Sequence, residues 1–183
     1  MILVPDRAYV EYMNTKGHIG RRDSVDFLVG VPEIMIEVVS RSEAAEILTS
    51  QLRCAEVTWL LSIGDAQDQP PAGYDNIRSK MRLLVADLLT EEGATDGDVQ
   101  RIIQLAESLR QETGKVLIHC EAGVSRSPAA ALIMYACWLG PGCEREAMVR
   151  VLAQRPVAIP NRRMVELADR ILGRGGRLLE VLG

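Results

Sequence analysis

Residues 115–128 constrain the fold of this 183-residue chain more than any other stretch. They open with an apolar run at 116–118, which is typical of a buried strand. A polar turn containing Gly123 follows, and then an apolar run at 129–139 that predicts a helix. In such an arrangement the loop N–H groups point inward and the helix N-terminus adds partial positive charge. The sequence therefore predicts an anion-binding site at this turn.

Two side chains of the turn indicate chemistry beyond anion binding. Cys120 ends the predicted strand and Arg126 begins the predicted helix. Backbone N–H donors and a nearby guanidinium favour a thiolate, which is a strong nucleophile. The planar fork of Arg126 can bind two oxygens of a tetrahedral dianion. Ser127 is placed to donate a hydrogen bond to the sulfur, and Pro128 suits a first helical turn. A buried structural cysteine beside a capping serine is the simpler alternative, but it would require neither the arginine nor the polar turn.

The pattern His-Cys-x-x-Gly-x-x-Arg-Ser at 119–127 resembles the signature of the cysteine-dependent protein tyrosine phosphatases. Its continuation into Pro128 is most similar to the dual-specificity subgroup and its compact bacterial relatives. The resemblance covers about 34–183 and is strongest over 81–169. It implies a nucleophilic Cys120, a supporting His119, and a phosphate-binding loop. The residues of that loop are Glu121, Ala122, Gly123, Val124, Ser125 and Arg126.

Hydrolysis of a phosphate monoester also requires an acid to protonate the leaving oxygen. In the dual-specificity subgroup this acid is an aspartate roughly thirty residues before the cysteine. Asp87 ends the predicted strand at 81–86 and occupies that place, although a plain strand-end turn residue is the alternative. The same loop holds the competing carboxylates Glu91, Glu92, Asp96 and Asp98. Of these, Asp96 and Asp98 have a simpler role as caps of the helix predicted at 99–112.

Other polar residues and thiols have more than one interpretation. Asn161 resembles an asparagine of the dual-specificity subgroup, and a helix cap explains it equally well. Cys137 lies in an apolar run and is predicted to be a core residue. Cys54 is a candidate for a reversible disulfide with Cys120, which the distance between them would decide.

The pattern of elements predicts an α/β fold with three layers, αβα. A small central mixed sheet of about four to five strands is flanked by helices, as the resemblance also implies. Strands are predicted at 34–39, 57–63 and 81–86, before the strand at 116–118. The first helix follows a Ser-x-x-Glu capping box at 40–43. Residues 34–183 are predicted to form a single catalytic domain. For residues 1–33 the sequence leaves three possibilities open: an N-terminal extension, a hairpin on the sheet edge or a partly disordered segment, with short strand candidates at 8–12 and 25–29.

Composition excludes several classes of function. The formal net charge of −4 does not favour nucleic acid or anionic membranes as partners. No apolar run is long enough for a membrane span, and the N-terminus lacks the features of a secretory signal. The four cysteines have neither CxxC nor metal-site spacing, and His119 has only His18 as a second histidine. We therefore expect a cytoplasmic protein without a metal or other cofactor, and the oligomeric state is not predicted.

The loop composition narrows the substrate. Positions 121, 122 and 124 lack the lysines that phosphoinositide phosphatases of this superfamily tend to carry. Aromatic residues make up only 4% of the chain, which disfavours a deep phosphotyrosine pocket. A shallow-pocketed protein phosphatase is expected, acting on phosphotyrosine, with phosphoserine and phosphothreonine as further candidates. The partner would be a phosphorylated protein or a small phosphomonoester.

Two alternatives come from other classes. One is a phosphate-binding module without turnover. The other is a thiol enzyme resembling arsenate reductase. Such an enzyme needs a second cysteine close to Cys120, whereas Cys137 and Cys143 lie at the far end of the predicted helix and beyond it.

Overall fold

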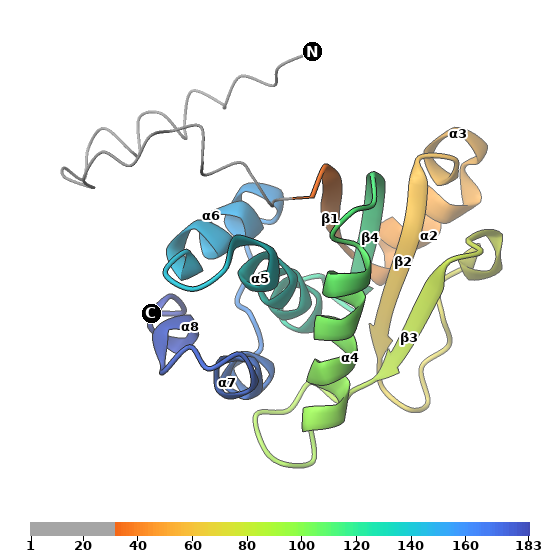
Figure 1. Cartoon of the computed structure of the whole chain (residues 1–183). Coiled ribbons are helices and arrows are strands. Elements are labelled where there is room, and N and C mark those ends of the chain that lie inside the picture. The colour runs from red at the N-terminus through yellow and green to blue at the C-terminus, as the bar shows by residue number, and fades with distance from the viewer. Residues whose placement is uncertain (1–31) are drawn as a thin grey trace.

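The protein is represented by a computed structural model, which describes residues 32–183. Its centre is a four-stranded sheet in the order β1-β4-β2-β3 (Figure 1). The strands are β1 (Ile34–Ser40), β2 (Val57–Gly64), β3 (Lys80–Leu84) and β4 (Gly114–Cys120). The central strand β4 is buried from Val116 to Cys120, as expected for a strand covered on both faces.

Helices cover both faces of the sheet (Figure 1). Helix α2 (Arg41–Thr49) and the short helices α3 (Gln51–Cys54) and η2 (Tyr74–Asn76) lie on one side. On the other side lie α4 (Asp96–Ser108), α5 (Arg126–Leu139), α6 (Glu144–Gln154) and α7 (Arg162–Ile171), with α8 (Arg177–Glu180) against α7. Each layer has its own apolar core. Leu117 on β4 packs into the smaller core, and Val116 and Ile118 pack into the larger one.

The predicted three-layer α/β arrangement is confirmed, with one refinement to the sheet. Every strand pair in the described residues is parallel, whereas a mixed sheet was predicted. The reason is that each connection between consecutive described strands is a crossover, so no hairpin places neighbouring strands antiparallel. The strand candidates at 8–12 and 25–29 lie outside the described residues, so the role predicted for the N-terminal segment stays a prediction.

The helix N-termini follow their local sequence. The predicted capping box is present at α2, where Ser40 N donates to Glu43 Oε2 at 2.7 Å and Glu43 N donates to Ser40 Oγ at 3.2 Å. At α4 the predicted cap was wrong. Thr95 is the cap and Asp98 is its partner three positions later, because the helix begins at Asp96 rather than near 99. Within residues 32–183, no helix combines the length and apolar character needed to cross a bilayer.

Candidate active site

The turn between β4 and α5 has the shape that the sequence predicts. Strand β4 carries Cys120 to the carboxyl edge of the sheet, and Arg126 is the first residue of α5. Between them Gly123 adopts a positive φ of 70°. A Cβ atom there would lie 2.7 Å from Ser40 N and from the carbonyl carbon of Val39, both backbone atoms of β1. The tight path of the loop against β1 therefore requires glycine at this position.

The carbonyl groups of the loop are held from outside it. Glu121 O accepts from Arg41 N at 3.1 Å, Ala122 O from Arg155 Nη2 at 3.3 Å, Val124 O from Ile159 N at 2.8 Å, and Ser125 O from Asn161 N at 3.1 Å. Within the described part of the chain, the N–H groups of residues 122–125 donate to no protein acceptor. The N-terminus of α5 also lacks a side-chain cap. The loop therefore presents free N–H donors at a helix N-terminus, the arrangement that binds anions.

The Cys120 side chain is buried and contacts a donor at the start of α5. Only 1% of Cys120 is exposed, and Ser127 Oγ donates to its Sγ atom at 3.1 Å. The sulfur therefore has the predicted partner in Ser127. Because the donor is a hydroxyl, this contact stabilises negative charge on the sulfur.

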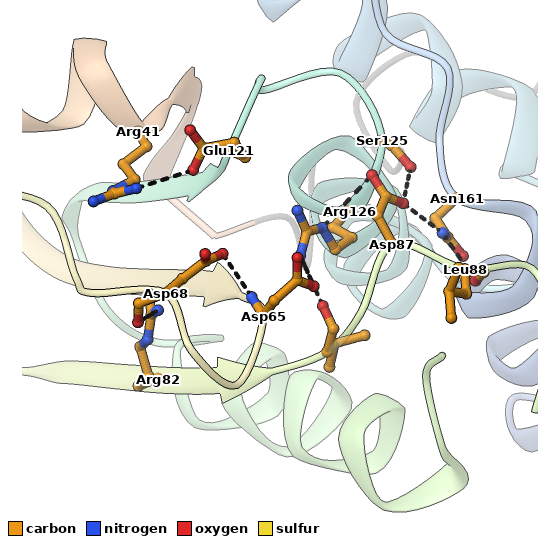
Figure 2. A network of polar contacts seen from close by, with 11 residues as sticks. Arg41, Asp65, Asp68, Arg82, Asp87, Leu88, Glu121, Ser125, Arg126 and Asn161 are labelled. Carbon is orange, nitrogen blue, oxygen red and sulfur yellow. Dashed lines mark hydrogen bonds and ion pairs between the residues drawn. The ribbon is translucent and has the colours of Figure 1, made fainter. Parts of the chain in front are cut away.

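The Arg126 guanidinium makes hydrogen bonds through Nη1 but not through Nε. The side chain is buried, and its Nη1 atom donates to Val85 O at 2.8 Å and to Asp65 Oδ1 at 3.1 Å (Figure 2). Its Nε atom is buried without a hydrogen-bond partner in the described structure, and Asp87 Oδ2 lies 3.6 Å from it. Buried donors are nearly always satisfied, so Nε, which makes no hydrogen bond here, is a candidate donor to an anion bound at the loop.

Asp87 lies directly beside this loop. Its Oδ1 atom accepts from Ser125 Oγ at 2.6 Å and from Asn161 Nδ2 at 2.8 Å (Figure 2). Asn161 also caps α7, since its Oδ1 atom accepts from Met164 N at 3.1 Å. Asn161 therefore caps α7 with one end of its amide and contacts Asp87 with the other.

The competing carboxylates have other positions. Asp96 pairs with Arg170, and Asp98 completes the Thr95 cap. Glu91 and Glu92 are exposed on the loop between β3 and α4. Of the carboxylates that the sequence proposed as the acid, Asp87 is therefore the one that contacts the Cys120–Arg126 loop in the described structure.

His119 is fully buried in β4 directly before the cysteine. Its Nδ1 atom lies 3.4 Å from Cys120 O, and its Nε2 atom has no partner in the described residues. Burial above all, together with the nearby charges of Arg82, Arg41 and Arg126, lowers the pKa of His119 to about 4. The ring is therefore neutral near pH 7 and adds no charge beside the cysteine.

The four cysteines are free, and Cys54 lies far from Cys120. Cys54 precedes β2 at the amino end of the sheet, and Val57 pairs with Lys115 at the start of β4. The length of β4 then separates Cys54 from Cys120 by at least about 15 Å, well beyond disulfide reach. Burial raises the pKa of Cys137 to about 12, which agrees with its predicted place in the core. The disulfide considered between Cys54 and Cys120 is therefore excluded in this fold.

Three polar residues near the site were not predicted as site residues. Asp65 follows β2 and contacts Arg126 directly. Behind it, Asp68 and Arg82 hold the Asp65 turn in place. The sequence held a partial signal for Asp65, because it follows a predicted strand, but that this strand lies next to β4 is known only from the sheet order.

Comparison with solved structures shows which known proteins share this fold. The described chain has the fold of the cysteine-dependent protein tyrosine phosphatases in their dual-specificity form, which confirms the resemblance seen in the sequence. Human DUSP28 is 23% identical, with a TM-score of 0.57, over 78% of this chain and 93% of that chain. DUSP15 is 23% identical, with a TM-score of 0.58, over 83% of this chain and 92% of that chain.

Two further proteins are similar to this chain, one in structure and one in sequence. The human tyrosine phosphatase-like serine/threonine/tyrosine-interacting protein has a TM-score of 0.55 and 22% identity, over 67% of this chain and 80% of its own. In sequence, the rat dual specificity protein phosphatase 5 is 40% identical over 62 residues. That match covers 34% of this chain and 16% of the rat protein, so it spans about a sixth of the relative's length. No protein-family model matches the chain.

Proposed function

We propose that this chain hydrolyses phosphate monoesters on proteins through a phosphocysteine intermediate at Cys120. One observation carries the proposal. The buried Cys120 sulfur accepts a hydrogen bond from Ser127 and stands at the start of a loop of free N–H groups. Beside this loop, Arg126 Nε makes no hydrogen bond in the described structure and lies 3.6 Å from Asp87 Oδ2. This set of groups matches a tetrahedral dianion in charge and in donor number.

In the proposed first step the Cys120 thiolate attacks phosphorus. A sulfur–phosphorus bond forms as the bond to the ester oxygen breaks, and Asp87 donates a proton to that leaving oxygen. The Arg126 guanidinium and the loop N–H groups stabilise the charge on the three remaining phosphate oxygens.

In the second step Asp87 accepts a proton from water as the water oxygen attacks phosphorus. The sulfur–phosphorus bond breaks, and the electron pair returns to Cys120, where the Ser127 hydroxyl stabilises the departing thiolate. Free phosphate is released and Asp87 is again protonated for the next turnover. Asn161 and Ser125 hold the Asp87 carboxyl in place, and His119 supports the cysteine backbone.

Exposed apolar side chains near the site favour a protein substrate. Leu88 and Leu89 follow Asp87, and they are 42% and 65% exposed. Val157 and Ile159 are 60% and 73% exposed on the segment before α7, and Ile159 N bonds to the loop at Val124 O. These two segments meet where Asn161 Nδ2 lies 3.4 Å from Leu88 O. Residues flanking a phosphorylated side chain would cover this surface, which a small phosphomonoester would leave in water.

The loop itself disfavours multiply phosphorylated ligands. Glu121 forms an ion pair with Arg41 at 3.3 Å, so this arginine is already engaged at the rim, and positions 121, 122 and 124 supply no lysine. We propose phosphotyrosine as the main substrate, with phosphoserine and phosphothreonine also accepted.

Hydrolysis of p-nitrophenyl phosphate and of matched phosphotyrosine and phosphothreonine peptides tests this proposal. We expect turnover that EDTA leaves unchanged, and acid-quenched reactions should carry phosphate on Cys120. The absence of turnover in a folded preparation that still binds phosphate would favour the non-catalytic module instead. That alternative is supported by the fold shared with a human protein named as phosphatase-like and interacting.

A further inference from the structure

We infer that Asp65 is a positioning residue that orients the Arg126 guanidinium toward the phosphate loop. This inference rests on the proposed function of the site. Arg126 Nη1 donates both to Asp65 Oδ1 and to Val85 O, at 3.1 and 2.8 Å (Figure 2). Two acceptors on one nitrogen fix the rotation of the planar group, while Nε makes no hydrogen bond in the described structure and lies 3.6 Å from Asp87 Oδ2.

Asp65 is itself held by a series of hydrogen bonds from β2 and β3. Asp65 N donates to Asp68 Oδ2 at 2.8 Å, which closes the turn after β2. Arg82 on β3 then donates from Nη2 to Asp68 O at 2.9 Å and from Nη1 to the buried Ser62 Oγ at 2.6 Å. A Cβ atom at Gly64 would lie 2.7 Å from Arg82 Nη2, so the strand end is shaped to admit the Arg82 side chain.

The orientation matters because bidentate binding of a phosphate requires the guanidinium plane to face two oxygens at once. With Val85 O as the only acceptor on Nη1, the group would retain freedom to rotate about that single contact. Asp65 also lowers the net positive charge near the site. Removal of the Asp65 side chain therefore has two opposite effects on anion affinity. Affinity falls because the Arg126 guanidinium is misoriented, and it rises because a negative charge is lost. Two variants separate these effects.

The test compares Asp65→Ala with Asp65→Asn in the full chain. Phosphate affinity is measured by protection of Cys120 from iodoacetamide, with the modified residue identified by mass spectrometry. In Asp65→Ala we expect phosphate affinity to fall by about tenfold to a hundredfold, the effect of losing one hydrogen bond to a charged group. Asp65→Asn should stay within about threefold of wild type, because its amide oxygen still accepts from Nη1.

A matched control is Asp75→Ala, which removes an exposed carboxylate that pairs with Lys80 at 2.9 Å in the segment before β3. It should leave phosphate affinity unchanged. Unchanged or tighter phosphate binding in folded Asp65→Ala would overturn the inference, as would equal losses in Asp65→Asn and Asp65→Ala. Should Asp65→Ala fail to fold, Asp68→Ala replaces it. That variant loosens the Asp65 turn and should weaken phosphate binding in the same direction, and wild-type affinity in it would also count against the inference.

The protection assay does not depend on turnover. If the wild-type protein binds phosphate but does not hydrolyse p-nitrophenyl phosphate, the proposed function fails while the role of Asp65 is still measured. If turnover is present, kcat/KM for p-nitrophenyl phosphate should follow phosphate affinity across the two Asp65 variants.

Discussion

Asn161 Nδ2 donates to Asp87 Oδ1 at 2.8 Å, although 74 residues separate them in the chain. The other end of the same amide, Oδ1, accepts from Met164 N at the start of α7. The Asn161 amide oxygen therefore caps α7 while its amide nitrogen donates to Asp87. The cap fixes the direction from which the nitrogen reaches Asp87. This couples the placement of the candidate acid to the position of α7.

Replacing Asn161 should separate these two purposes. Asn161→Ala loses the cap and the donor, so stability should fall by about 0.5–2 kcal/mol and turnover should fall as well. Asn161→Asp keeps a capping oxygen but places a second carboxylate beside Asp87, so stability should recover while turnover stays low. Urea unfolding and kcat/KM for a phosphopeptide measure the two effects. Wild-type turnover in Asn161→Asp would show that the contact with Asp87 has no role in the reaction.

Cys120→Ser should abolish turnover and retain phosphate binding. The hydroxyl is a far weaker nucleophile than a thiolate, while the loop N–H groups and Arg126 remain in place. Arg126→Ala should lose both turnover and binding, because the loop then lacks its guanidinium. Phosphate titration followed by nuclear magnetic resonance distinguishes the two variants. Residual turnover in Cys120→Ser at more than trace level would argue against a phosphocysteine.

Asp87→Asn should slow hydrolysis of an alkyl phosphate by roughly 10²–10⁴-fold, the usual contribution of a general acid. The effect should be much smaller for p-nitrophenyl phosphate, whose leaving oxygen needs little protonation. The amide keeps a similar shape and retains the Oδ1 acceptor for Ser125, and comparing the two substrates separates the loss of the proton from the loss of the ion pair with Arg126. A near wild-type rate on the alkyl phosphate would remove Asp87 from the mechanism.

Gly123→Ala should distort the loop and cost roughly 1–3 kcal/mol of stability, together with most of the activity. The added Cβ would meet backbone atoms of Val39 and Ser40 at 2.7 Å, and backbone cannot move aside as a flexible side chain can. Gly142 is the matched control, since its φ is also positive, at 87°, but a Cβ there meets nothing within 4 Å. Gly142→Ala should therefore carry only the cost of its backbone angle and keep full activity. Equal activity loss in both variants would contradict the steric explanation.

Stability should fall as the pH is lowered from about 6.5 to 4, because His119 is buried in its neutral form. Its pKa is lowered to about 4 in the folded protein from an ordinary value of 6.5, so the unfolded chain binds the proton more tightly. The neutral, buried His119 contributes its full stabilisation above the pKa of the unfolded chain, about 6.5. This contribution is lost as the pH falls toward the pKa of the folded protein, about 4. The full difference is on the order of 3 kcal/mol. Urea unfolding at a series of pH values measures this slope, and His119→Gln should flatten it in that window.

The local chemistry of the site could be predicted because its residues are contiguous. Strand, loop and helix start lie within residues 115–128, so apolar periodicity and the positions of Cys120 and Arg126 suffice to place the anion loop. The cap at Ser40 follows from the same kind of short-range pattern. At α4 the prediction failed because aspartate and threonine are both good caps, and the true start of the helix decides between them.

Contacts across the fold were less accessible to sequence reasoning. Asp87 was found because it ends a strand, but its bond with Asn161 depends on how α7 packs. Asp65, Asp68 and Arg82 were missed because no local pattern says which strands are neighbours.

The sequence alone determined which groups are present at the loop: a thiol, a guanidinium, a glycine and a helix start, all within one short segment. Only the tertiary structure decided which residues from other elements contact these groups. The strand order β4-β2-β3 brings Asp65 and Val85 to Arg126, and the packing of α7 brings Asn161 to Asp87. The physical reason is that parallel strands gather their carboxyl ends at one edge of a sheet, and burial of apolar faces, not adjacency in the chain, sets which strands lie together.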